Sequence, residues 1–172
     1  NVIIKIKSVI MDFNLSMEKF AEKTLGKLEV GFKKVAFGLS EDIIMATPVD
    51  SGRARGNWFP EINSFSNQED LKADDKKGSK AINKTKSKVR ALKLGQTFTL
   101  TNNLPYIEKL EYGLYPLNPK YGTKYEIRDS DNFVTETGFV ILSQGGFSKQ
   151  APQGMVRINL IKWQQHINNG FK

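Results

Sequence analysis

The spacing of apolar residues predicts one long helix in the first third of the chain. Ser16 is a suitable N-cap, and apolar residues follow it at intervals of three or four up to Ile44. Pro48 disfavours helical geometry at Thr47, so we expect this helix to end near Met45. Three glycines inside it each weaken a helix by about 1 kcal/mol relative to alanine, and they suggest close packing against another backbone: Gly26, Gly31 and Gly38.

Shorter patterns predict two strands and two more helices in the middle of the chain. We interpret "NWFPEINSF" as an edge strand, since it contains a proline, and the alternating "QTFTLTNN" as a half-buried strand. Residues 79–94 form a basic amphipathic helix, in which Ile82, Thr85, Val89 and Leu92 point inward. "LPYIEKLEYG" reads as a short helix with Ile107 and Leu110 inward and Gly113 as its terminator.

The last third predicts an arm followed by a final helix. In residues 114–147, "KYEIRD" and "NFVTETGFVIL" are strand-like and "SDN" is the turn of a hairpin. Pro152 and Gly154 form a turn that starts a helix from Met155 to Ile167, which buries Met155, Ile158, Leu160 or Ile161, and one edge of Trp163.

The order of these elements predicts an α+β fold. The long N-terminal helix and the C-terminal helix pack on an antiparallel sheet. We expect one domain over residues 1–172, with a basic insertion at 66–94 and a hairpin arm at 114–147. The N-terminal run "NVIIKIKSVIMDF" is interpreted as a short strand, because it is apolar and interrupted by lysines.

Composition narrows the class of protein. The chain has no cysteine, which fits assembly in a reducing cytoplasm, and no run of about 18 apolar residues or signal-peptide cleavage site, so we expect a soluble protein without a membrane partner. The net charge of +8 is concentrated in residues 72–93, where nine basic residues face only Asp74 and Asp75. The sequence therefore predicts a domain of nearly zero net charge that carries a basic insertion.

Catalytic and metal-binding patterns are weak. The only histidine, His166, lies on a polar helix end, so neither a Ser-His-Asp triad nor a zinc site is supported. Glu108 and Glu111 share one helical face and suit a metal or an acid–base pair, although a solvated or interface charge pair is the simpler interpretation. "DSDN" at Asp129 lacks the glycine and glutamate of a calcium loop. We predict no enzyme activity and no cofactor.

Two groups of basic residues suggest partners. On the basic helix, four side chains are candidates for contact with DNA phosphates, although a solvated or protein-facing arm is an equal alternative: Lys80, Lys84, Lys88 and Arg90. In "DSGRAR", Arg53 and Arg55 point the same way if the segment is extended and suit carboxylates at an interface, or Asp50 pairs with one of them inside the subunit.

Three segments, in this order after a long helix, carry a resemblance to a known family. They are "TPVDSGRARGNW" (residues 47–58), "NNLPYIEKLEYG" (residues 102–113) and "SKQAPQGMVRI" (residues 148–158). Together they resemble the neck and tail-completion proteins of tailed bacteriophages, which include head-tail joining and minor tail components. Shorter relatives run almost directly from the "LEYG" motif to "SKQAP", whereas residues 114–147 intervene here.

The resemblance implies a virion structural protein, assembled in the host cytoplasm, without enzymatic activity. It implies a homo-oligomeric ring in the neck, a hexamer by expectation, between the head connector or adaptor protein and the tail terminator or tail tube protein, with genomic DNA passing through the lumen. The expected interface residues lie in or beside the three segments: Asp50, Arg53, Arg55, Tyr106, Glu108, Glu111, Lys149 and Arg157. Among these, Lys149 and Arg157 are predicted to pair with Glu108 or Glu111 of a neighbouring subunit.

Two rival functions stay open from the sequence. One is a nucleic-acid-binding protein without sequence specificity that uses residues 72–93. The other is a metal-dependent nuclease built on Glu108 and Glu111.

Overall fold

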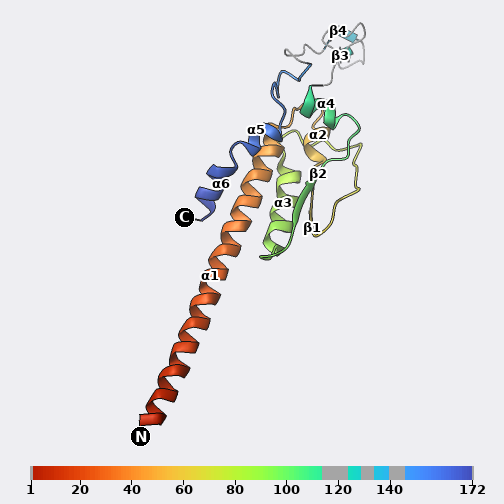
Figure 1. Cartoon of the computed structure of the whole chain (residues 1–172). Coiled ribbons are helices and arrows are strands. Elements are labelled where there is room, and N and C mark those ends of the chain that lie inside the picture. The colour runs from red at the N-terminus through yellow and green to blue at the C-terminus, as the bar shows by residue number, and fades with distance from the viewer. Residues whose placement is uncertain (1, 114–123, 129–133, 140–145, 172) are drawn as a thin grey trace.

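The computed structural model describes residues 2–113, 124–128, 134–139 and 146–171, with side chains for residues 16–113 and 146–171. It combines helices with a small antiparallel sheet, and it has a long N-terminal helix and helices at its C-terminal end (Figure 1). The elements follow in this order along the chain: α1 (Val2–Ala46), α2 (Arg53–Gly56), β1 (Phe59–Ile62), α3 (Ser79–Ala91), β2 (Phe98–Thr101), α4 (Ile107–Tyr112), β3 (Lys124–Arg128), β4 (Val134–Phe139), α5 (Arg157–Leu160) and α6 (Trp163–Gly170).

Helix α1 is longer than the sequence predicted. It runs without interruption from Val2 to Ala46, so the expected strand at the N-terminal run and the expected N-cap at Ser16 are both wrong. No proline or glycine separates that run from the helix, and its β-branched residues lower helix propensity only slightly. The C-terminal end is close to the predicted one: the hydroxyl of Thr47 donates to the carbonyl of Ile43 at 2.8 Å. At about 1.5 Å per residue, the 45 residues of α1 span roughly 67 Å.

The hydrophobic core lies around the C-terminal third of α1. Trp58 anchors it, because its ring is buried and its indole N–H donates to the hydroxyl of Thr47 at 2.8 Å. The buried apolar residues of the core come from α1, α2, α3, α4, the loops between them and the segment just before α5: Ile43, Ile44, Ala54, Trp58, Ala81, Leu104, Leu110 and Met155.

The sheet pairs β1 with β2 in antiparallel register, with Phe59 opposite Thr101 and Ile62 opposite Phe98. This confirms both predicted strands, the half-buried character of β2 and the edge position of Pro60. Helix α3 packs on β1 with one side and on α1 with another, whereas α6 packs on α1. The main cover of the sheet is therefore α3, whereas the N- and C-terminal helices pack mainly on each other.

The basic amphipathic helix is confirmed as α3, which ends at Ala91. Thr85, Val89 and Leu92 are buried as predicted, and Ile82 is half-buried. The carboxylate of Asp75 accepts a hydrogen bond from the Ala81 N–H at 2.9 Å, which satisfies one of the free donors in the first turn.

The predicted hairpin strands are present as β3 and β4, an antiparallel pair with Lys124 opposite Phe139 and a register shift at Arg128. The predicted "SDN" turn lies outside the described residues, as do 114–123 and 140–145 of the arm.

The C-terminal segment forms two helices instead of the single helix predicted. The side chain of Asn159 is buried and donates to the carbonyls of Met155 and Asp42, at 2.7 and 3.2 Å, which fixes α5 against α1. The chain then turns at Ile161 and Lys162 before α6 begins. Met155 is fully buried as predicted, but Leu160 and Ile161 are exposed, because Asn159 occupies the inward position of this turn.

Two of the three glycines in α1 lie where α6 crosses it. A Cβ added to Gly31 would collide with the ring of Phe171, and one added to Gly38 would lie 2.7 Å from Nδ1 of His166. Gly170 in turn approaches the Gly31 carbonyl, so a Cβ there would lie 2.9 Å from it. The predicted close packing against a backbone is thus present at Gly31, whereas Gly26 has nothing near it.

We expect Gly38→Ala to lower the free energy of unfolding by about 1 kcal/mol, because the displaced imidazole outweighs the gain in helix propensity. The matched control is Gly26→Ala, which adds a methyl group to the same helix in open space and should raise the helical circular dichroism signal. Thermal unfolding of both variants, followed at 222 nm, measures the contrast. Equal effects from the two substitutions would contradict this role of Gly38.

Candidate functional site

The three segments that carry the family resemblance meet at one place in the structure, which we call the motif junction. Gln150 of the third segment binds the backbone of Val49 in the first, accepting from its N–H at 2.7 Å and donating to its carbonyl at 2.8 Å. Asn102 of the second segment donates to the carbonyl of Ala54 at 2.9 Å. The junction therefore joins segments about 50 and 100 residues apart in the sequence.

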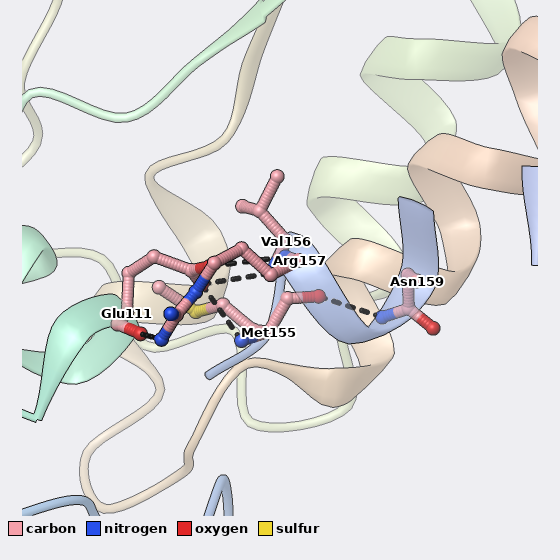
Figure 2. A network of polar contacts seen from close by, with 5 residues as sticks. All are labelled: Glu111, Met155, Val156, Arg157 and Asn159. Atoms are coloured by element: carbon pink, nitrogen blue, oxygen red, sulfur yellow. Dashed lines mark hydrogen bonds and ion pairs between the residues drawn. The ribbon is translucent and has the colours of Figure 1, made fainter. Parts of the chain in front are cut away.

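Glu111 is the centre of the motif junction (Figure 2). It is only 6% exposed, and its carboxylate accepts hydrogen bonds from three consecutive N–H groups, those of Met155 at 2.7 Å, Val156 at 2.8 Å and Arg157 at 2.9 Å. These are donors at the start of α5 that have no partner within the helix. Glu111 thus fixes the place where the chain returns to the core after the hairpin arm.

Arg157 closes the same network from the other side. Its Nε lies 3.2 Å from the Glu111 carboxylate, and its terminal nitrogen donates to the Glu111 carbonyl at 2.7 Å. The guanidinium also lies 5.1 Å from the ring centre of Tyr112. The predicted partners Arg157 and Glu111 pair within one chain, and the predicted pairing between subunits stays a prediction.

Burial alone would raise the pKa of Glu111. The hydrogen bonds from Val156, Arg157 and Met155 and the side chain of Arg157 outweigh it and hold the pKa below its usual value. The carboxylate is therefore charged in the folded protein at neutral pH.

Arg55 has a structural role in the first segment. Its guanidinium donates to the carbonyls of Met45, Thr47 and Lys76 at 2.8 to 3.3 Å, which ties the end of α1 to the loop before α3. Burial lowers the pKa of Arg55, and nearby Asp75 opposes this shift. Arg53 is exposed. The two arginines do not point the same way, since α2 makes this segment helical instead of extended.

The other predicted interface residues are not part of the Glu111 network. Asp50, Glu108 and Lys149 are exposed, and Tyr106 is half-buried against the core. No ion pair joins Asp50 to Arg53 or Arg55 within residues 16–113. The Glu111 carboxylate binds the N–H groups at the start of α5, whereas the Glu108 side chain is exposed, so the two carboxylates lie in different environments.

Three of the four predicted phosphate contacts have partners inside the chain. Lys80 pairs with Asp74 and Lys88 with Glu61. Lys84 donates to the Gly56 carbonyl at 3.0 Å and lies 3.8 Å from the centre of the Phe59 ring. Burial lowers the pKa of Lys84, against the attraction of Asp75 and Asp70. Arg90 is exposed, so the predicted DNA contact of this helix stays a prediction.

The single histidine of the sequence lies where α6 contacts α1. His166 is largely buried between α1 and α6, with Nε2 3.0 Å from the Asp42 carboxylate. Across residues 16–113 and 146–171, no group of three or more acidic, histidine or cysteine side chains is placed to hold a metal ion. No helix in the described part of the chain has both the length and the apolar character of a membrane span.

A small pocket of about 180 Å³ opens at the motif junction. Residues of all three segments line it: Trp58, Asn102, Ile107, Glu108, Glu111, Tyr112, Met155 and Val156. Sequence patterns pointed to these segments but missed the roles of Asn102 and Asn159, since an amide that bonds a distant carbonyl leaves no periodic signal.

No protein-family model, curated protein or solved structure matches this chain.

Proposed function

We propose that the chain is a structural subunit of the neck of a tailed bacteriophage, a head-tail joining or tail-completion protein that acts as a homo-oligomeric ring, by expectation a hexamer. The observation that carries this proposal is the motif junction. Segments 47–58, 102–113 and 148–158, which resemble that family, are joined by direct hydrogen bonds although two long insertions separate them. If the three segments lay on separate surfaces, their resemblance to the family would be weak support for the proposal. Because they form a single structural unit, the support is stronger.

A ring subunit needs two different surfaces that meet when the copies are rotated about one axis. The extended α1, which projects far from the body in Figure 1, gives the subunit the reach to contact a neighbour. In the neck, one side of such a ring binds the head connector or adaptor protein, and the other binds the tail terminator or tail tube protein.

Gene deletion in the phage that encodes this chain tests the proposal. We expect filled heads and complete tails that stay unjoined, and we expect the protein to be found by mass spectrometry in wild-type virions. Cryo-electron microscopy of the neck should show a ring of this chain. Joined particles without the gene product, or a protein absent from virions, would refute the proposal.

A further inference from the structure

The middle of α1, from Met17 to Leu28, has an apolar face that no described residue covers. A helix turns about 100° per residue, which places six residues on one side. The largest of them, Phe20, is 66% exposed. We call this side the open face, and it comprises Met17, Phe20, Ala21, Thr24, Leu25 and Leu28.

The open face continues the side of α1 that is buried in the body. Further along the helix, Gly31, Val35 and Gly38 lie on the same side and are covered by α6, while α3 packs beside them. Helix α6 ends at Gly170, against Gly31 and Val35, so the cover stops where the open face begins. An exposed apolar patch that extends a core surface is typical of a protein–protein interface.

Charged residues flank the open face, and they are segregated by sign. By the same angular spacing, one flank is acidic and the other is basic. The acidic flank has Glu18, Glu22 and Glu29, and the basic flank has Lys23, Lys27 and Lys34. Glu29 pairs with Lys33 of its own helix at 2.8 Å and lies 3.8 Å from the Nζ of Lys93.

This segregation determines which direction a second copy favours. If two α1 helices meet antiparallel through their open faces, a two-fold axis across them brings acidic flank to acidic flank and basic to basic. If they run parallel, rotation about an axis along the helices brings the acidic flank of one copy against the basic flank of the next. Only the parallel arrangement is complementary in charge.

We propose that copies of this chain associate through the open face, with their α1 helices parallel and the acidic flank of one beside the basic flank of its neighbour. This inference rests on the proposed function, because a ring requires self-association. It adds the surface through which the subunits contact each other and the relative direction of their α1 helices. A rotation axis along the helices is also the symmetry of a closed ring.

Cross-linking of the full-length protein tests the direction. Because the chain has no cysteine, single cysteines can be introduced without further changes. If the helices are parallel, a short bis-maleimide should join two copies of the Met17→Cys variant, and likewise two copies of the Leu28→Cys variant. It should not join a cysteine at 17 to one at 28, since the 11 residues between them correspond to about 16 Å along the axis. The control is Val30→Cys, 53% exposed on the opposite side of α1, which should stay unlinked.

Charge reversal tests the flanks. Glu18→Lys with Glu22→Lys reverses two of the three charges on the acidic flank, and Lys23→Glu with Lys27→Glu reverses two of the three on the basic flank. Each double variant should associate about tenfold more weakly in sedimentation equilibrium, while the quadruple variant should recover. These side chains are exposed, so circular dichroism should show unchanged folding.

Three results would overturn the inference: a monomer at all concentrations, cross-links between cysteines 17 and 28 in a mixture of the two variants, or association that is indifferent to both reversals. Self-association as predicted, with the protein absent from virions, would refute only the proposed function. A ring in the virion neck whose subunits do not touch through α1 would refute only this inference.

Discussion

Glu111→Gln is expected to lower the free energy of unfolding by about 3 kcal/mol, a large effect for a substitution that keeps the shape of the side chain. One carboxylate oxygen accepts from Met155 and Val156, and the other accepts from the backbone and Nε of Arg157. An amide replaces one of these oxygens with a donor that faces two donors, so two buried N–H groups lose their partner. Chemical denaturation of both proteins at neutral pH measures the difference.

The same substitution has a predictable pH dependence. The folded protein holds the pKa of Glu111 below its usual value, so the charged form contributes stability above the unfolded pKa of about 4.3. This contribution is lost as the pH falls through the folded pKa. The difference in unfolding free energy between wild type and Glu111→Gln should therefore be constant above about pH 5.5 and shrink on further acidification.

Glu108→Gln is the matched control, since it makes the same chemical change one helical turn away on an exposed side chain. It should alter stability by less than about 0.5 kcal/mol. If the two variants were equally stable, Glu111 would not hold the motif junction together. If both instead abolished a metal-dependent nuclease activity, the rival interpretation of this carboxylate pair would return.

The sequence predicted those elements whose signal is local. The spacing of apolar residues and the positions of turn residues predicted α3, α4 and the strands. Each of these elements buries one side of a short segment, and some end at a residue that terminates a helix, such as Gly113, whose φ is +69°. The N-terminal run is hard to predict, because a short apolar stretch with β-branched residues fits both a strand and a helix, and only its continuity with α1 decides between them.

The candidate site was harder to predict, because its residues meet across long sequence separations. The three segments were found by resemblance, but nothing in their letters shows that Glu111 binds N–H groups 44 to 46 residues away. The same long separation explains why two lysines of the basic helix were predicted to bind phosphate. Lys88 pairs with Glu61, 27 residues away, and Lys84 donates to the Gly56 carbonyl, 28 residues away. A pattern of charged residues in the sequence predicts a binding surface well only when no residue from a distant part of the sequence pairs with those charges in the fold.

Gly52→Ala is expected to lower the free energy of unfolding by about 3 to 4 kcal/mol. Gly52 has a φ of +90°, which costs a residue with a side chain about 1 to 2 kcal/mol. A Cβ at this position would also lie 2.5 Å from the backbone nitrogen of Lys76 and 2.7 Å from the carbonyl carbon of Asp75. Since these are backbone atoms, the loop itself must move, and with it the carboxylate of Asp75 that binds the first turn of α3.

Gly95→Ala separates the two causes, because Gly95 has nearly the same φ, +86°, but nothing within 4 Å of the added methyl group. It should cost only the backbone term of about 1 to 2 kcal/mol. The remaining loss in Gly52→Ala then measures the displacement of the loop from Asp74 to Lys76, and it should be accompanied by faster hydrogen exchange in α3. Equal losses for the two variants, with α3 protected in both, would mean that the close approach at Gly52 relaxes freely and that the first segment does not position the basic helix.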